Sequence, residues 1–220
     1  MDTPDPGAGR LSRLDACAVS DAMDRLGLAG VVTGLAPLSV ARRIAGRVVT
    51  LRLGTGPAAA GPVRHLGTTA IESASTGDVV VVEQRSGVDA GCWGGLLSLA
   101  AKARGIAGVV ADGPVRDVDE ARAHDFPVFA RSCTARTARG RIVELGTNVP
   151  VQVGEVTVSP GDFVVADGSA VVFVRAADLD RVLEAAERIA AREALMAKAI
   201  LAGDPVTQVM GADYEHLLKR

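Results

Sequence analysis

The sequence has few aromatic residues and few cysteines. Aromatic side chains make up 3% of its 220 residues, so the hydrophobic share of 48% comes mainly from alanine, valine and leucine. The cysteines, Cys17, Cys92 and Cys133, are odd in number and widely spaced. That spacing excludes a disulfide framework, and no zinc-binding pattern is present. We therefore expect a reduced, cytoplasmic protein with an aliphatic core.

Long apolar runs and an excess of charge are also absent. No run reaches the length needed to cross a bilayer, and the first ten residues lack the apolar segment of a secretory signal. The formal net charge of −2 gives no general attraction to nucleic acid or to an anionic membrane. The expected protein is a soluble enzyme that binds neither.

The length fits one main domain with appendages. We predict a flexible tail over 1–9, a single α/β catalytic domain over 10–175, a long helix over 176–202 and a C-terminal tail over 203–220. The long helix exceeds what a small core needs, so it is expected to pack at a subunit interface. Apolar residues between Leu11 and Leu26 predict an earlier helix, interrupted at Ser20-Asp21.

The rest of the chain is organised around residues 88–120. A helix is predicted from Gly94-Gly95 to Gly105, a buried strand from Ile106 to Ala111, and a turn at Asp112-Gly113-Pro114, which Asp112 could cap. Val79 to Glu83 predicts a strand before them. Parallel strands joined by a helix place their following loops on one edge of the sheet, where open α/β folds bind ligands. The loops at 92–95 and 113–120 should therefore face one another.

The residues of these two loops have complementary chemistry. Free amides at Gly94-Gly95 suit an anion, and Arg116 offers a planar cation to a carboxylate or an enolate. Asp117 and Glu120 supply the hard oxygen ligands that Mg²⁺ or Mn²⁺ prefers. Acids at a helix start are more often structural when considered alone. Their convergence on one sheet edge favours a site for a small 2-oxo acid.

Several other residues allow two interpretations. Trp93 could line the pocket or pack in the core, and Asp119 is expected to face solvent. His65 could be catalytic, but a lone histidine is more often structural. The glycine-rich segment 54–59 begins like the fingerprint of a dinucleotide-binding motif. Pro57 removes a backbone amide that such a motif needs, so we predict a loop there.

Beyond Asp125 the pattern changes to short β-rich segments separated by turns. They cover residues 127–131, 141–145, 151–153, 156–158, 162–165 and 170–174. A striped Ala/Glu/Arg-rich helix follows over about 177–201. The expected class is α/β with mixed sheets and a long C-terminal helix.

These segments together resemble the RraA-like family. The resemblance rests on the segments Gly94 to Gly105 and Gly108 to Glu120. Active members of the family share a glycine, then twenty residues, an Arg-Asp pair, two further residues and an acid. Gly95, Arg116, Asp117 and Glu120 match that spacing. Weaker likenesses lie at Val19–Gly27, His65–Gly67, Gly77-Asp78 and Val158–Gly168. The resemblance implies a layered β/β/α fold of the swivelling-domain kind, assembled as a homotrimer or hexamer with the active site near a subunit boundary.

The resemblance also implies an activity. Family members include divalent-metal pyruvate aldolases acting on 4-hydroxy-4-methyl-2-oxoglutarate, whereas the inhibitors of ribonuclease E in the family have an altered Arg-Asp pair. We therefore predict a lyase that cleaves a 4-hydroxy-2-oxo acid to pyruvate and also decarboxylates oxaloacetate. The alternative is a non-catalytic regulator that binds ribonuclease E or an RNA helicase.

The predicted mechanism assigns a role to each residue. Backbone amides of Cys92, Trp93, Gly94 and Gly95 hold the substrate carboxylate, and Arg116 stabilises the enolate. Asp117 holds Mg²⁺ or Mn²⁺ directly, and Glu120 steadies the metal through water. The three lysines, Lys102, Lys198 and Lys219, fall outside these loops, which argues against a Schiff base. A water on the metal is the expected base for the hydroxyl proton.

Overall fold

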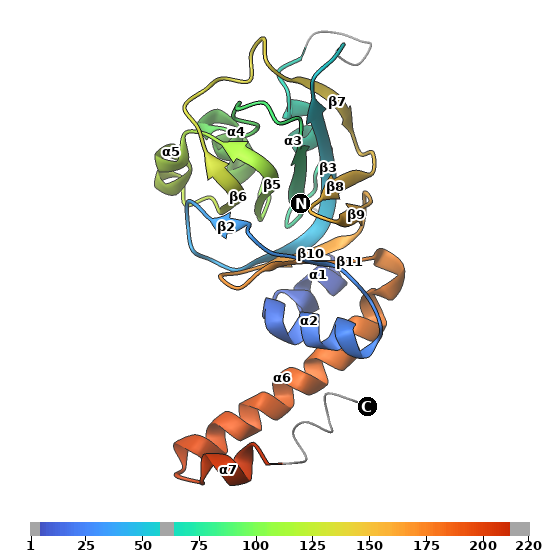
Figure 1. Ribbon diagram of the computed structural model, residues 1–220, viewed down its shortest axis with the longest axis vertical. Coiled ribbons are helices and arrows are strands. Elements are labelled where there is room, and N and C mark those ends of the chain that lie inside the picture. The colour runs from blue at the N-terminus through green and yellow to red at the C-terminus, as the bar shows by residue number, and fades with distance from the viewer. Residues whose placement is uncertain (1–4, 58–63, 212–220) are drawn as a thin grey trace.

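The computed structural model describes residues 5–57 and 64–211 (Figure 1). Its helices are α1 (Pro6–Leu11), α2 (Ala16–Arg25), α3 (Thr68–Ser73), α4 (Gly95–Ala103), α5 (Val118–Ala123), α6 (Leu179–Leu201) and α7 (Val206–Val209), with a 3₁₀ turn η1 (Ala176–Asp178). Its strands are β1 (Val31–Val32), β2 (Ala36–Pro37), β3 (Ile44–Gly54), β4 (Val79–Gln84), β5 (Gly108–Val115), β6 (Val128–Cys133), β7 (Val143–Thr147), β8 (Val151–Val153), β9 (Val156–Val158), β10 (Phe163–Ala166) and β11 (Val171–Val174).

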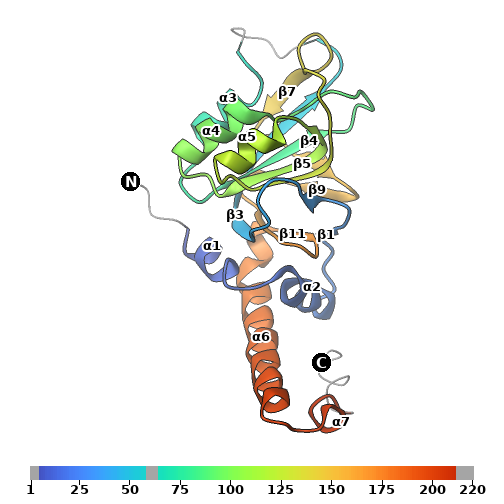
Figure 2. The ribbon, with the colours of Figure 1, turned by 90° about the vertical axis from the view of Figure 1, so that its left-hand side faces the viewer.

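Four parallel strands form the part of the sheet that positions the predicted site. β3, β4, β5 and β6 lie in that order and pair in parallel, with Val80 opposite both Val49 and Val109. The connecting helices α3, α4 and α5 lie together on one face of these strands (Figure 2). Val79 to Val82 are all fully buried, as expected for a strand covered on both faces. The alternation of strands and helices predicted before residue 125 is confirmed.

Antiparallel strands cover the other side. The long strand β3 also pairs with β10, which continues to β11 and β1, and the hairpin of β8 and β9 packs against the same core. A further core lies between β10, β11 and the helices α1, α2 and α6. The predicted class, a layered α/β fold with mixed sheets and a long C-terminal helix, is confirmed.

The N-terminal helices differ from the prediction. Residues 6–9 of the expected flexible tail lie in α1, because the Asp5 carboxylate caps the amides of Gly7 and Ala8 and Pro6 occupies the first turn. The chain breaks at 12–15, and Asp15 caps α2 through the amide of Ala18. Ser20 and Asp21 therefore lie within a continuous helix and do not interrupt it. Residues 1–4 lie outside the described part.

The central strand also runs further than predicted. β5 continues through Asp112-Gly113-Pro114, where we expected a turn, because Pro114 and Val115 pair with Ser132 and Cys133 of β6 after a register shift. Asp112 is thus a strand residue and does not cap a turn. The glycine-rich segment after β3 is described only to Pro57, where it forms a bend, and the rest of it lies outside the described residues.

The long helix α6 has two different halves. Leu179, Val182, Leu183, Ala186 and Ile189 are buried against α1, α2 and the antiparallel strands. The outer half projects from the body and ends beside α7, which occupies part of the expected C-terminal tail (Figure 1). There Leu195 is 69% and Leu201 is 88% exposed. No described helix is long and apolar enough to cross a membrane.

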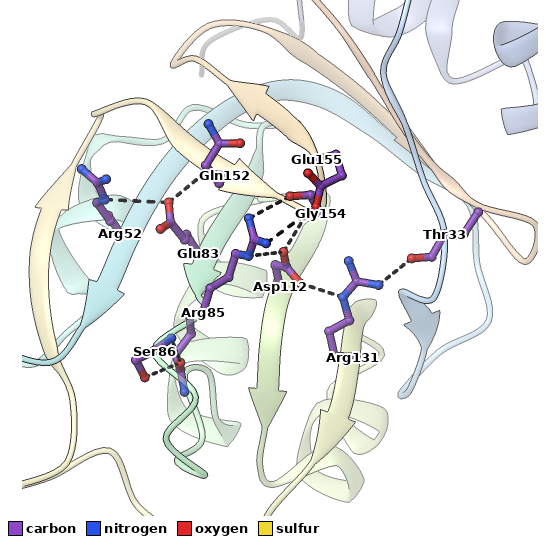
Figure 3. A network of polar contacts seen from close by, with 11 residues as sticks. Thr33, Arg52, Glu83, Arg85, Ser86, Asp112, Arg131, Gln152, Gly154 and Glu155 are labelled. Carbon is purple, nitrogen blue, oxygen red and sulfur yellow. Dashed lines mark hydrogen bonds and ion pairs between the residues drawn. The ribbon is translucent and has the colours of Figure 1, made fainter.

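A network of charged groups ties the β8–β9 hairpin to the carboxyl ends of β4, β5 and β6 (Figure 3). The buried Asp112 carboxylate accepts from Arg131 Nε at 2.6 Å and from the Gly154 amide at 2.7 Å. Arg85 Nη1 donates to the Gly154 carbonyl at 2.8 Å, and Glu83 Oε2 accepts from the Gln152 amide at 2.7 Å. These contacts fix the sheet edge from which the two predicted loops leave.

Removing the centre of this network should destabilise the protein. Asp112→Ala would leave the Arg131 guanidinium and the Gly154 amide without their partner, which we expect to lower the free energy of unfolding by about 3 kcal/mol. Chemical denaturation measures this change. Asp119→Ala is the matched control because that side chain is 97% exposed and, among the described residues, pairs with Arg122 alone on the surface. Equal stability of the two variants would contradict the role given to Asp112.

Candidate active site

The two predicted loops meet, as expected from the crossovers. The Arg116 amide donates to the Trp93 carbonyl at 2.9 Å, and the Cys92 amide donates to the Pro114 carbonyl at 2.9 Å. Between the loops lies an open pocket of about 260 Å³. It is lined by residues of both loops, among them Trp93, Gly94, Gly95, Arg116 and Asp117. The prediction that the loops share a pocket is confirmed.

Three glycines of the first loop make room for three charged side chains of the second. A Cβ atom on Gly91 would lie 2.8 Å from Arg116 Cγ, and one on Gly94 would lie 2.9 Å from Asp117 Oδ2. A Cβ atom on Gly95 would overlap the Glu120 carboxylate. Any larger residue at Gly95 would therefore push Glu120 away. The glycines place the arginine and both acids against one short stretch of backbone.

The backbone and side chain of Asp117 are arranged for contact with the neighbouring loop. Its φ of 55° and ψ of 39° are left-handed, a region that aspartate tolerates better than most residues. Its carboxylate does not cap its own helix α5. Instead it accepts from the Gly95 amide and from Arg116 Nε, both at 3.2 Å. The side chain remains 31% exposed, so the carboxylate can take a further ligand.

Cys92 and Trp93 form the inner wall of the pocket. The Cys92 amide is already bound to Pro114 and the Gly95 amide to Asp117, so neither amide is free to hold a substrate carboxylate as predicted. Burial raises the pKa of the Cys92 thiol to about 12, which leaves it protonated and unreactive at neutral pH. Trp93 is buried, and its indole Nε1 donates to Ser98 Oγ at 3.0 Å. Trp93 packs in the core and also lines the pocket, so both roles considered for it are found together.

The rest of the pocket lining was not predicted from the sequence, except that His65 was considered as a possible catalytic residue. It is formed by His65, Leu66, Thr137, Ala138 and Arg139. The loop 134–142 lies against the two predicted loops because the Thr134 amide donates to the Val115 carbonyl and the Gly91 amide donates to the Arg136 carbonyl. No local motif marks Thr137, Ala138 or Arg139, since their position depends on long-range contacts.

A larger hollow of about 390 Å³ lies elsewhere, between α2, β11 and the β8–β9 hairpin. Its buried acids are used by the chain itself. Asp162 accepts from the amides of Ser159 and Ala176, and Asp178 pairs with Arg175 and Arg181. We therefore assign the chemistry to the smaller pocket, where side chains retain free hydrogen-bonding capacity.

The donor set of the pocket fits a divalent cation of the magnesium type. Within the described residues no three His, Cys, Asp or Glu side chains gather as a metal cage. Mg²⁺ is commonly held by only one or two carboxylates, with water and substrate completing its shell. Asp117 and Glu120 meet that requirement, because both carboxylates lie against Gly94-Gly95.

Comparison with known proteins identifies the family. Residues 16–173 match the family model described as RraA-like, Aldolase/RraA, and the chain belongs to this family. A relative in Halalkalibacterium halodurans, provisionally named a 4-hydroxy-4-methyl-2-oxoglutarate aldolase, is 31% identical over 83% of this chain and 82% of its own. The Legionella pneumophila protein DlpA is 27% identical over 90% of this chain, which spans 32% of DlpA.

Solved structures show the same fold. An uncharacterized protein from Pseudomonas syringae superposes with a TM-score of 0.83 at 28% identity, over 96% of this chain and 100% of its own. A Streptomyces coelicolor protein superposes with a TM-score of 0.75 at 26% identity, over 89% of this chain and 98% of its own. That protein is described as an unusual member of the RNase ES inhibitor RraA protein family. The family thus includes proteins named as enzymes and proteins named as regulators.

The glycine contacts predict the effect of adding one methyl group. Gly95→Ala should displace the Glu120 carboxylate and lower the affinity for Mn²⁺, measured by titration calorimetry, without unfolding the protein. Gly168→Ala is the matched control because nothing lies within 4 Å of its Cβ position. Unchanged Mn²⁺ affinity in Gly95→Ala would show that the Gly95–Glu120 contact does not shape a metal site.

Proposed function

We propose that this protein is a divalent-metal-dependent pyruvate aldolase that cleaves 4-hydroxy-4-methyl-2-oxoglutarate or a related 4-hydroxy-2-oxo acid. Oxaloacetate decarboxylation would accompany this activity, because both reactions pass through the enolate of pyruvate. The observation that carries the proposal is the packing of Arg116, Asp117 and Glu120 against Gly91, Gly94 and Gly95, beside a pocket that the three glycines line together with Arg116 and Asp117. The aldolase name carried by the Halalkalibacterium relative supports it.

Arg116 has the geometry needed to stabilise an enolate. Its Nε donates to Asp117, and within the described residues its two Nη groups make no hydrogen bond. The guanidinium can therefore offer both Nη groups to the substrate's carboxylate and 2-oxo group while Asp117 fixes its orientation. A positive charge fixed beside a developing oxyanion lowers the barrier to carbon–carbon cleavage.

The carboxylates complete this arrangement. Asp117 would hold Mg²⁺ or Mn²⁺ directly, and Glu120 would steady it through water. The metal supplies Lewis-acid stabilisation of the 2-oxo group when bound. The backbone of Trp93 and Gly94 would bind the three-carbon end of the substrate, with Gly95 holding Asp117 beside it and Cys92 behind as an apolar wall. Arg139, which also lines the pocket, would offer a second cation to the remainder of the substrate.

A Schiff-base mechanism receives no support from the lysines. Lys102 lies at the far end of α4, where its Nζ pairs with Asp125 at 3.2 Å. Lys198 is on the outer half of α6, and Lys219 lies outside the described residues. Neither described lysine lines the pocket.

We propose that the protein also self-associates as a homotrimer or hexamer, using the outer half of α6. This assignment is supported by exposed apolar side chains on α6 (Leu195 and Leu201) and at the two ends of α7 (Val206 and Met210), because a projecting apolar arm is costly in water. A monomeric mass by analytical ultracentrifugation at micromolar concentration would contradict it.

The second candidate function is regulation of a ribonuclease or an RNA helicase without chemistry. The description of the Streptomyces coelicolor structure favours it. Pull-down of ribonuclease E by a protein with no effect on oxaloacetate would support this alternative. The retained Arg116-Asp117 pair favours catalysis.

Metal dependence is the direct test of the proposed function. Purified protein mixed with oxaloacetate and Mg²⁺ should release pyruvate, followed by coupling to lactate dehydrogenase. EDTA should abolish this release, and added Mn²⁺ or Mg²⁺ should restore it. Full activity in excess chelator would refute metal dependence, and no pyruvate under any metal would refute the lyase.

Two variants test, in the same assay, whether the activity depends on the pocket residues. Arg116→Ala and Asp117→Asn should each lower kcat/KM by about 100-fold or more while the fold persists. Arg188→Ala and Asp119→Asn remove the same charges from exposed positions and should leave kcat/KM unchanged. Normal rates in either pocket variant would refute its assignment.

A further inference from the structure

His65 lines the same pocket as the Gly94-Gly95 stretch of backbone. Its backbone is held in a turn just before α3, because the Thr68 amide and hydroxyl both bind the His65 carbonyl, at 3.2 and 2.7 Å. The Gly67 amide donates to Glu144 Oε2 at 2.9 Å, which anchors the same turn to β7. Hydrogen bonds therefore hold the turn that carries His65 at the edge of the pocket.

The imidazole ring has one nitrogen committed and one available. Nδ1 lies 2.9 Å from the Leu66 carbonyl oxygen. Because a carbonyl oxygen can only accept, the proton of the neutral ring must be on Nδ1. Nε2 then carries a lone pair and can act as a base. Binding of one ring nitrogen to a fixed acceptor is the usual way in which a catalytic histidine is held in one tautomer.

The other ionisable groups lining the pocket are unsuited to proton transfer. Burial raises the pKa of the Cys92 thiol to about 12, so that thiol stays protonated. Arg116 and Arg139 carry guanidinium groups, which have hydrogen-bond donors and no acceptor. The Asp117 carboxylate is the group assigned to the metal, and it also accepts from Arg116 and the Gly95 amide. Among the described lining residues, His65 is the one whose ring carries a nitrogen that can accept a proton and return it.

We propose that His65 is the acid–base residue of the aldol cleavage, in place of the water expected from the sequence. This inference rests on the proposed function. Nε2 removes the proton of the C4 hydroxyl, and the O–H electron pair becomes the C4 carbonyl. The C3–C4 bond breaks, and its electrons form the C2–C3 double bond of the enolate beside Arg116. The imidazolium then returns the proton to C3, which gives pyruvate and the second carbonyl product.

Comparison of two substrates on one enzyme tests this role. Decarboxylation of oxaloacetate breaks a carbon–carbon bond without removing a hydroxyl proton, and its enolate can take a proton from water after release. His65→Gln should therefore lower kcat for 4-hydroxy-4-methyl-2-oxoglutarate by about 100-fold or more. It should change oxaloacetate decarboxylation by less than about threefold. His124→Gln, a histidine outside the pocket, is the matched control and should affect neither rate.

Chemical rescue separates proton transfer from a positioning role. His65→Ala opens space at the rim, so added imidazole should restore aldol cleavage in proportion to its concentration. Oxalate, which resembles the pyruvate enolate, should bind the wild type and both variants alike in calorimetry. If the wild type is active and His65→Gln cleaves the substrate normally, this inference is overturned while the proposed function stands. Equal losses on both substrates without rescue by imidazole would have the same consequence. A wild type inactive on both substrates would overturn the proposed function as well.

Discussion

The contact between the Gly94-Gly95 backbone and the Arg116–Glu120 turn is the constraint on which the site depends. Two loops from successive crossovers meet there because glycine leaves space for a carboxylate at each position. The Gly95 amide binds Asp117 directly, and Asp117 in turn orients Arg116. Opposite charges and a polarised amide are thus held together before any ligand arrives, which is the arrangement that electrostatic catalysis requires.

The rest of the fold keeps these loops in place. The parallel strands β4 and β5 bring both loops to one edge, and Asp112 pins the β8–β9 hairpin to the opposite face of that edge. The loop 134–142 closes the third side through backbone bonds to Val115 and Gly91. Main-chain contacts therefore hold the site in place, and Arg116, Asp117, His65 and Arg139 are the described polar side chains that this account assigns to ligands.

Much of this arrangement follows from local sequence rules. The glycine before α4 and the acids after β5 mark loops, and the handedness of parallel crossovers then requires that those loops share an edge. The extension of β5 through Pro114 could not be predicted, since it results from pairing with β6. The Asp5 cap of α1 is a local signal that could have been recognised, because aspartate followed by proline is a common helix start.

The remaining residues of the site could be identified only from the three-dimensional structure. His65 and Arg139 are 74 residues apart and no motif connects them, yet both line the pocket. The commitment of the Cys92 amide to Pro114 was likewise invisible in the sequence, so the predicted amide contribution of Cys92 had to be corrected. Residue types and spacing predicted the chemistry of the site, whereas long-range packing determined which groups remain free to perform it.

The most direct measurement is a crystal structure of the protein with Mn²⁺ and oxalate. The account predicts an anomalous manganese peak beside the Asp117 carboxylate, with oxalate between that ion and the Nη groups of Arg116. Manganese and oxalate bound away from the Gly94-Gly95 backbone would contradict the claim that these two loops form one catalytic pocket.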